Sequence, residues 1–349
     1  MNIVEAISRV SAGQDLTQSQ MTEIMKQVMT GGATSAQIAG LLVALKMKGE
    51  TPEEITGAAM VMRELATPVK VTCEHLVDTC GTGGDGARIF NVSTAAAFVA
   101  SAAGAHVAKH GNRSVSSSTG SADLLEAAGV NLMVDANLVA RAVETIGLGF
   151  LFAPSHHSAM KHAIGPRKDL ALRTIFNLLG PLTNPAGVKR QVIGVFDKSL
   201  CRVLAEVLQR LGSEHVLVVH SDDGLDEFSI AANTHVAELK QDKISEYTIS
   251  PSDFGLEYTD LSGLAVDDAE QSLKLIRSVF KRSSAEENAD VIDKAAAMIA
   301  LNAGAAIYVS GIARDLKEGF AMAEDAIACG GAQEKLSALV QFTQASAET

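Results

Sequence analysis

Two patterns of hydrophobic and polar positions divide the chain. Near the N-terminus apolar residues recur at helical spacing, as at Ile38, Leu41, Leu42 and Leu45, which is typical of helices that bury one face. From Leu76 onward, short apolar runs alternate with Ala-rich helical stretches, which favours a largely parallel sheet with helices on both faces. The pattern predicts an α/β protein: a small helical domain plus a larger α/β domain with a largely parallel central sheet.

The helical part carries clear start signals. Thr17, Thr34 and Thr51 each stand three residues before a Gln or Glu, and Pro52 follows the last of them. These are capping boxes, and proline is favoured at the first helical position. The apolar face of these helices has two interpretations: burial in the domain's own core, or a dimer contact, since so small a bundle builds little core by itself.

The strand predictions rest on short apolar runs bounded by turn residues. A helix expected to end at Gly180-Pro181 interrupts the alternation and could return the chain to the helical domain. The predicted domains are 1–70, joined in space by about 165–188, and 71–349 without that segment. The segment 281–290 is expected to be a solvated turn between helices. The runs interpreted as strands are 75–81, 105–111, 131–135, 147–154, 190–196 and 215–221.

Composition narrows the class of protein. The 349 residues are 47% hydrophobic and 20% charged, as in an ordered globular protein. A net charge of −12 argues against binding to nucleic acid, which requires broad basic surfaces. The four cysteines form no CxxC pair, so reduced thiols and a cytoplasmic location are expected. The sequence contains no run of about 20 uninterrupted apolar residues, so it predicts no membrane-spanning segment.

The first loop with candidate chemistry spans residues 78–94, "DTCGTGGDGARIFNVST". Its glycines let the backbone approach a ligand closely and present N–H groups to it. Asn91 to Thr94 then open an Ala-rich helix, whose N-terminus favours an anion. The alternative is a plain glycine turn followed by an ordinary helix cap.

The second loop spans residues 109–123, "KHGNRSVSSSTGSAD". Lys109 supplies a positive charge, and the serines before the next helix are candidate donors to phosphate oxygens. His110 and Asn112 could grip a planar or carboxylated partner. The alternative is that Ser121 only caps its helix while Arg113 faces water.

The third loop follows the run 215–221 and contains Asp226 and Glu227. Two adjacent carboxylates suit Mg²⁺, which prefers one or two carboxylates together with waters and substrate phosphates. A solvated acidic turn is the alternative. Opposite two anion-binding loops, however, these carboxylates would repel a diphosphate unless a metal lay between them. The remaining basic candidate is Arg167, which could pair with a substrate carboxylate or with the neighbouring Asp169.

In family order and at family-like spacing, "GTGGDG", "FNVST", "KHGNRSVSS", "GPRKDLALRTIFNLLGPLTNP", "DGLDE" and "NAGAAIYVSG" occur along nearly the full chain. The chain thereby resembles the anthranilate phosphoribosyltransferases. This resemblance implies transfer of phosphoribose from phosphoribosyl pyrophosphate (PRPP) to the amine of anthranilate in tryptophan biosynthesis. It also implies Mg²⁺, with two ions at the pyrophosphate, and a homodimer formed through the helical domain.

The same resemblance assigns roles to residues. Lys109, Asp226 and Glu227 match catalytic positions, and Ser93, Asp226 and Glu227 match metal positions. The anthranilate positions are Gly81, His110, Asn112, His157 and Arg167. The PRPP positions are Gly81, Gly84, Asp85, Ile89, Asn91, Val92, Ser93, Thr94, Lys109, His110, Gly111, Asn112, Arg113, Ser114, Val115, Ser116, Ser117 and Ser121.

Two residues depart from the family pattern. Ile89 stands where relatives often carry a hydroxyl, and Ser158 replaces a frequent proline after the His pair. The alternatives to the transferase are a pyrimidine-nucleoside phosphorylase, which shares this architecture, and a nucleic-acid-binding relative on the same scaffold.

Overall fold

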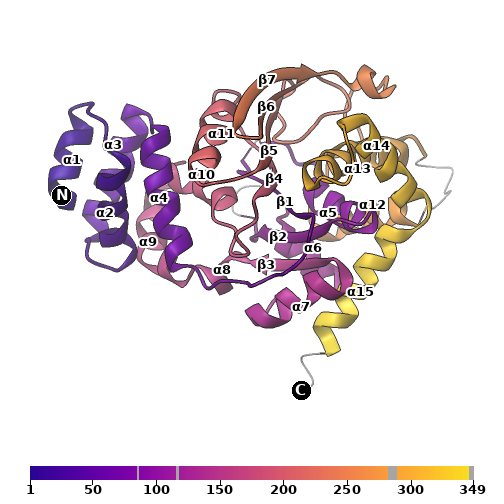
Figure 1. The fold of residues 1–349 in the computed structure, drawn as a ribbon, viewed down its shortest axis with the longest axis horizontal. Helices are drawn as coiled ribbons and strands as arrows, with labels where there is room; N and C mark the ends of the chain where they lie inside the picture. The colour runs from indigo at the N-terminus through magenta and orange to yellow at the C-terminus, as the bar shows by residue number, and fades with distance from the viewer. Residues whose placement is uncertain (85, 115–117, 282–288, 346–349) are drawn as a thin grey trace.

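The computed structural model describes residues 1–349 except 85, 115–117, 282–288 and 346–349. A small lobe of helices stands beside a larger α/β body, and the N-terminus lies at the far end of the small lobe (Figure 1). The predicted fold class is confirmed. The predicted solvated turn at 281–290 falls largely outside the described residues.

The small lobe is built from four capped helices, α1 (Ile3–Ser11), α2 (Gln18–Met29), α3 (Ser35–Lys48) and α4 (Pro52–Leu65). The three predicted capping boxes are confirmed, and Asn2 begins α1 in the same way. The apolar faces of these helices are buried against one another, with Ile38, Leu41, Leu42 and Leu45 all inside. Tertiary burial of that face, more than helix propensity, stabilises such short helices.

The body contains one seven-stranded sheet in the order β3-β2-β1-β4-β5-β6-β7. The first five strands in the chain are parallel, and the last two are antiparallel. The carboxyl ends of the parallel strands therefore meet at one edge of the sheet. The strands are β1 (Leu76–Gly81), β2 (His106–Gly111), β3 (Leu148–Phe152), β4 (Arg190–Gly194), β5 (His215–Ser221), β6 (Thr234–Lys240) and β7 (Lys243–Ile249).

Helices cover both faces of the sheet. In β5, Leu217 and Val219 belong to one core cluster while Val216 and Val218 belong to the other, as the two-residue period of a strand requires. The first face carries α5 (Val92–Ala102), α6 (Ser121–Ala128), α12 (Ala269–Phe280), α13 (Ala289–Ser310), α14 (Leu316–Ala328) and α15 (Gly331–Ala345). The second carries α7 (Ala136–Ile146), α10 (Ile175–Leu182) and α11 (Leu200–Arg210).

Two sequence-based expectations require correction. Residues 131–135 form no strand: Thr343 accepts the Asn131 N–H, and Asp135 caps α7. The segment 165–188 holds two helices, α9 (Lys161–Leu170) and α10, because Ala171 takes a left-handed φ of 48°. Helix α10 ends at Leu182, one residue after the predicted end at Gly180-Pro181. The hairpin of β6 and β7 was not predicted.

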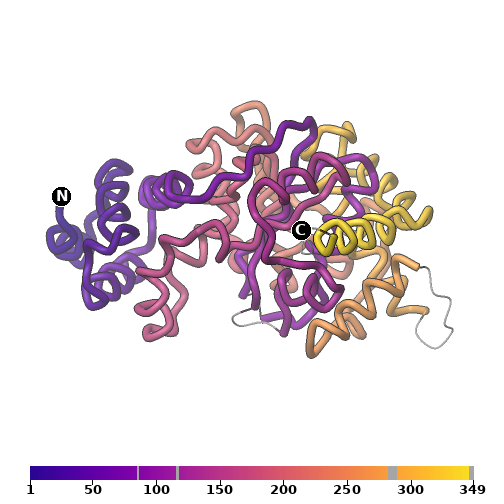
Figure 2. The backbone as a smooth tube through the Cα atoms, turned by 90° about the horizontal axis from the view of Figure 1, so that it is seen from below, coloured from indigo at the N-terminus to yellow at the C-terminus, as the bar shows by residue number. Residues whose placement is uncertain are grey.

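The chain crosses between lobe and body more than once (Figure 2). After α4 it runs along residues 66–75 to β1, and it returns through α8 (Ala153–His156), a 3-10 turn (Ser158–Met160) and α9. Helix α9 packs against α2 and α3, and α10 packs against α3 and α4. After α10 the chain reenters the sheet at β4. The proposed domain division at residue 70 stays a prediction.

By length and composition alone, α13 could cross a membrane. Within its most apolar window, however, 72% of the residues are buried inside the structure. Its contacts with α5, α14 and β4 make it a core helix. The remaining short element is a 3-10 turn at Pro251–Phe254.

Candidate active site

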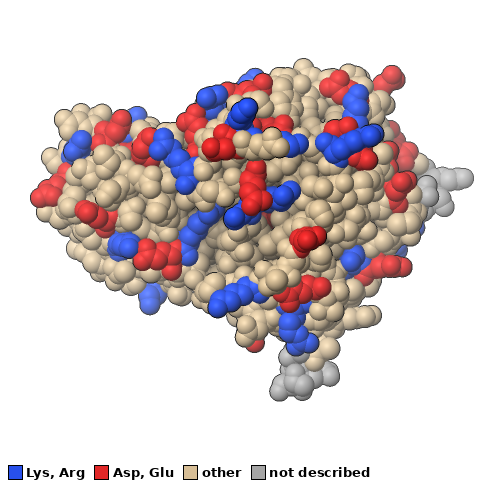
Figure 3. Space-filling model, in the orientation of Figure 1, with Lys and Arg blue, Asp and Glu red and all other residues tan. Residues whose placement is uncertain are grey.

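Three predicted loops meet at the carboxyl edge of the sheet. The Asp226 Oδ2 atom accepts the Gly83 N–H at 3.0 Å, and the Glu227 Oε1 atom accepts the Ser93 N–H at 3.2 Å. The acidic loop after β5 therefore touches both the glycine loop after β1 and the N-terminus of α5. Figure 3 shows side chains of both charge signs along the hollow between the small lobe and the body.

Close backbone approach explains two of the glycines at this edge. Gly81 and Gly194 are register partners in β1 and β4, and Asp226 lies directly over them. A Cβ atom on Gly194 would lie 1.5 Å from the Asp226 carbonyl oxygen, and one on Gly81 would lie 2.5 Å from Asp226 Oδ2. Any larger residue at position 194 must displace the acidic loop.

The N-terminus of α5 is held without a conventional side-chain cap. Asn91 is the N-cap residue, but its amide bonds instead to Ser272 and to the Thr119 carbonyl. Thr94 donates to Ser121 Oγ at 2.9 Å, which ties the start of α5 to the start of α6. The two helix N-termini thus face the same region, and helix N-termini favour anions.

Lys109 is buried at the end of β2, with 2% of its surface exposed. Its ammonium group donates to the Thr79 carbonyl at 2.5 Å and to Ser93 Oγ at 3.4 Å. Burial lowers the pKa of Lys109, while the nearby Asp78 carboxylate opposes that shift. The side chain brings a positive charge to the helix N-terminus where the acidic loop also ends.

His110 and His157 form a buried pair of rings with centroids 5.1 Å apart. The Nε2 atom of each ring is buried without a hydrogen-bond partner. Burial, with the neighbouring His157, lowers the pKa of His110 to about 3, and burial lowers that of His157 to about 4. Both rings are therefore neutral near pH 7, and each has an Nε2 atom that could form a hydrogen bond with a ligand.

The alternative interpretation of the second loop, in which Ser121 caps its helix and Arg113 faces water, is met only for Arg113. Ser121 is the first residue of α6 and not its cap, which is Gly120. Arg113 is exposed to solvent, as the alternative expects, and it also pairs with Glu126 and lies over the Phe152 ring. The Ser114 N–H donates to Asp123.

Ile89, one of the two departures from the family pattern, is half-buried and forms an isolated bridge with Ala265.

Four predicted PRPP residues, Asp85, Val115, Ser116 and Ser117, lie outside the described residues. Arg167 lies with its guanidinium 5.2 Å from the Phe176 ring centroid, and burial lowers its pKa. The described ion pairs do not include Arg167 with Asp169. The roles assigned to all these residues stay predictions.

Sequence reasoning missed Arg173. This arginine, in the loop between α9 and α10, lies over the Phe196 ring and donates to the Gly84 carbonyl in the glycine loop. The missed signal is a second arginine six positions after Arg167, in the same segment that returns to the small lobe.

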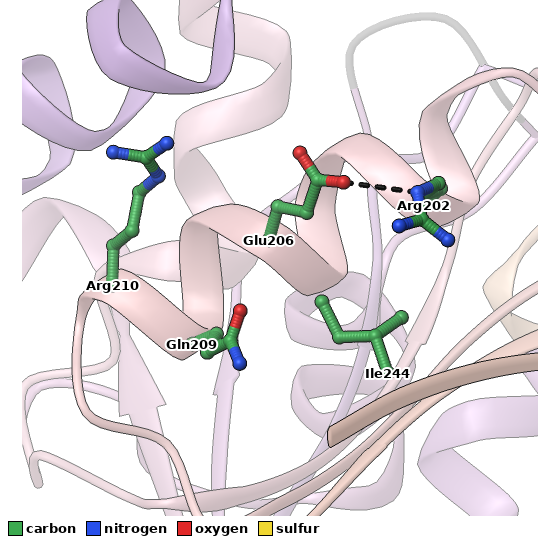
Figure 4. A pocket seen from close by; sticks show the side chains of 5 residues that line it. All are labelled: Arg202, Glu206, Gln209, Arg210 and Ile244. Atoms are coloured by element: carbon green, nitrogen blue, oxygen red, sulfur yellow. Dashed lines mark hydrogen bonds and ion pairs between the residues drawn. The ribbon is translucent and has the colours of Figure 1, made fainter. Parts of the chain in front are cut away.

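A separate hollow of about 290 Å³ lies on α11 and β7. Its arginines are already paired: Figure 4 shows Arg202 with Glu206. Arg202 also pairs with Glu246, and Arg210 pairs with Glu53. It holds none of the predicted site residues, so it does not compete with the sheet edge as the candidate active site.

The magnesium prediction agrees with the donor set. Among the described residues no group of three His, Cys, Asp or Glu side chains could hold a metal by itself. Two carboxylates beside anion-binding N–H groups fit an ion that takes its other ligands from water and phosphate. Asp226 and Glu227 would hold it, with Ser93 alongside.

Comparison with known proteins decides the family. The model of the "Glycosyl transferase family, a/b domain" matches residues 73–333, and that of the helical bundle domain matches residues 4–66. The anthranilate phosphoribosyltransferases of Teredinibacter turnerae and Saccharophagus degradans are each 67% identical over 343 residues, 98% of this chain and 99% of theirs. The chain belongs to the anthranilate phosphoribosyltransferase family.

Solved structures of this family agree with that assignment. The Thermus thermophilus enzyme superposes with a TM-score of 0.89 at 42% identity, covering 97% of this chain and 99% of its own. The Saccharomyces cerevisiae enzyme in complex with PRPP and Mg has a TM-score of 0.86 at 26% identity, covering 98% of each chain.

The tight packing at Gly194 generates a stability prediction. Gly194→Ala should lower the free energy of unfolding by about 2 kcal/mol or more, because the new Cβ overlaps the Asp226 carbonyl. Gly40→Ala in α3, where a Cβ would meet only the Ile7 Cδ1 atom at 3.8 Å, should instead raise it by up to about 1 kcal/mol. Urea denaturation of both variants measures this, and equal effects would contradict the packing argument.

The buried histidines generate a pH prediction. Unfolding frees rings that bind a proton near pH 6.5, whereas the folded rings resist protonation down to about 3 and 4. Stability is therefore fully present above pH 6.5 and falls as the pH drops, by about 1.4 kcal/mol per pH unit for each ring. His110→Gln should make the fall between about pH 6 and about pH 4.5 shallower, because the variant lacks one of the two rings that resist protonation in the folded state, and urea denaturation at each pH measures this.

Above pH 7 both rings are neutral in the folded and unfolded states, so the variant and the parent should show equal slopes there. That range is the internal control. Parallel curves over the whole acidic range would show that His110 is protonated in the folded protein.

Proposed function

We propose that this protein transfers the phosphoribosyl group of PRPP to the amino group of anthranilate, giving N-(5-phosphoribosyl)anthranilate and pyrophosphate in tryptophan biosynthesis. The observation that carries the proposal is the meeting of the glycine loop, the start of α5 and the acidic loop through Gly83–Asp226 and Ser93–Glu227. Family membership supplies the substrates.

The anionic half of PRPP would bind where backbone N–H groups gather. The glycine loop has left-handed φ values at Gly83 and Gly84, which turn the backbone toward the sheet edge. The paired N-termini of α5 and α6 add aligned dipoles. Asp226 and Glu227 would hold Mg²⁺, which supplies charge neutralisation for the departing pyrophosphate. Lys109 adds a second positive charge at the same place.

The acceptor half needs positioning more than a strong base. An aryl amine is neutral at pH 7 and attacks C1 of the ribose directly; the C1–N bond forms as the C1–O bond to pyrophosphate breaks. The electron pair leaves with pyrophosphate, and the amine then releases a proton. Neutral His110 and His157 fit beside a neutral aromatic amine, because the Nε2 atom of each ring has no hydrogen-bond partner within the protein. Arg167 fits its carboxylate.

The direct test follows anthranilate fluorescence with and without PRPP and Mg²⁺. Asp226→Asn with Glu227→Gln should lower turnover by about a hundredfold or more and abolish the response to added Mg²⁺, since both carboxylate charges are lost. Arg314→Gln, which changes a highly exposed ion pair far along the chain, is the matched control. Near-normal turnover in the double variant would refute the metal role, and no anthranilate consumption by the parent would refute the function. Mg²⁺ titration in the presence of pyrophosphate tests the proposed two ions.

A homodimer through the small lobe is part of the proposal. Helices α1, α3 and α9 pack side by side, and each exposes an apolar side chain: Val4 (59%), Met47 (83%) and Ile164 (45%). Apolar side chains gathered on one lobe are typical of an interface. Met47→Arg should shift the protein from dimer to monomer in light scattering after gel filtration, whereas Met133→Arg, equally apolar but on the body, should not. A monomeric parent would end this proposal.

We also propose that the enzyme is cytoplasmic. This proposal is supported by the four cysteines, all of which are free thiols: Cys73, Cys80, Cys201 and Cys329. Cell fractionation followed by detection of the protein tests it.

A further inference from the structure

The sheet is split at the active-site end between β1 and β2. Their paired residues are only Leu76 with His106 and Val77 with Val107. Beyond that point β1 pairs with β4 from Asp78 to Gly81, and β2 pairs with β3 up to Gly111. The two strands thus have no residue pairs with each other where Lys109 and His110 lie.

Side chains replace the missing backbone pairing. The His110 N–H donates to Asp78 Oδ1 at 3.1 Å. The Ala108 carbonyl accepts from Asn184 Nδ2 at 2.8 Å. The Thr79 carbonyl accepts from the Lys109 ammonium group. These three backbone groups, which a continuous ladder would pair with each other or with neighbouring backbone, are satisfied here by side chains, as buried polar groups require.

Asp78 and Asn184 form the centre of this arrangement. Asp78 is fully buried, and its Oδ2 atom accepts from Asn184 Nδ2 at 2.8 Å. The Asn184 Oδ1 atom accepts the Ala186 N–H, so both ends of the amide are engaged. A buried carboxylate with donors on both oxygens is costly to disturb, because loss of one donor leaves a charge without compensation.

Asn184 also ties the site to the chain crossings. It stands directly after α10, where the chain leaves the small lobe for β4. The next residue, Pro185, accepts the Val69 N–H at 3.0 Å, so the first crossing is fastened to the same turn. Any shift of this turn is therefore passed through Asn184 to Asp78, and from Asp78 to the backbone of His110.

We propose that Asn184 and Asp78 are positioning residues, which hold the split between β1 and β2 and thereby set where Lys109 and His110 lie. The inference rests on the proposed function for its kinetic consequences, but the contacts themselves do not depend on any substrate. Neither residue is expected to touch the reacting atoms.

Reciprocal exchange of the two side chains tests the proposal. Asn184→Asp alone sets two buried carboxylates against each other, and Asp78→Asn alone sets one amide donor against another. Each single variant should lower kcat by about a hundredfold while changing the KM for PRPP by less than about threefold. The reason is that Lys109 and His110, which would be displaced, are expected to act on the transition state more than on bound PRPP. The double exchange, Asp78→Asn with Asn184→Asp, restores one donor–acceptor pair and should regain about tenfold in kcat.

Leu239→Ala is the control for stability. Leu239 is fully buried in β6 beside Val216, at the opposite end of β5 from Asp226. It should lose thermal stability while keeping the parent's kcat, so a kinetic loss in the exchange variants cannot come from reduced stability alone. Folded single variants within about threefold of the parent's kcat would overturn the proposal. A double variant no faster than the slower single variant would also overturn it.

Hydrogen exchange at the His110 amide gives a readout without substrate. Exchange should be at least about tenfold faster in each single variant, because the Asp78 acceptor is lost or reoriented, and slow again in the double variant. Unchanged exchange overturns the positioning role even if the protein proves to have another activity, while an inactive parent with the expected exchange pattern refutes only the proposed function. If the single variants fail to fold, Asn184→Ser, which keeps one donor for two acceptors, should lose about tenfold in kcat. A folded Asn184→Ser protein with the parent's kcat and exchange rate overturns the proposal.

Discussion

The carboxylates of Asp226 and Glu227 bond to the same backbone N–H groups that make the sheet edge an anion site. Gly83 N–H and Ser93 N–H each donate to one of them. A diphosphate cannot take those donors while two carboxylates occupy them, because like charges would meet at short range in a partly buried place. Asp226 and Glu227 would resolve the conflict by holding a cation such as Mg²⁺, which would supply the positive charge that both the carboxylates and a phosphate group need. The two carboxylates therefore fit this edge as a place for an anion only together with a cation.

This constraint determines much of the surrounding structure. The acidic loop reaches the glycine loop only because β1 and β4 end in paired glycines, Gly81 and Gly194, with no Cβ in the way. The start of α5 is open to Glu227 only because Asn91 turns its amide to Ser272 and does not cap the helix. On the other side of β1, Lys109 can cross to Thr79 and Ser93 only because β2 separates from β1 after Val107. Each of these features weakens local regularity and is supported by burial on both faces of the sheet.

What the sequence predicts well is local or periodic. Capping boxes such as Thr34 with Gln37 involve residues three apart, and the strands from β1 to β5 carry apolar runs that both faces of the sheet bury. The β6–β7 hairpin was missed because its turn uses Gln241 and Asp242 with φ of 51° and 61°, without the Asn-Gly signal for such turns. Residues 131–135 are apolar enough for a strand, but their polar groups are taken by Thr343 and by the cap of α7. The three site loops were predictable from residue type. The partners that hold them, Asn184 and Asp78 among them, were not, because they are brought together from 106 positions apart.

The split in the sheet and the two-lobed shape of the molecule have a common origin. A continuous β1–β2 ladder would satisfy its own backbone, and the turn at Asn184 would then have no polar reason to enter the body. With the ladder interrupted, the open carbonyl of Ala108 and the buried carboxylate of Asp78 require a donor from outside the two strands, and the chain returning from α10 supplies it. The same turn accepts Val69 from the first crossing. The chain that returns from the small lobe is therefore joined by hydrogen bonds to Asp78 and, through it, to the backbone of His110, at the point where the two strands part.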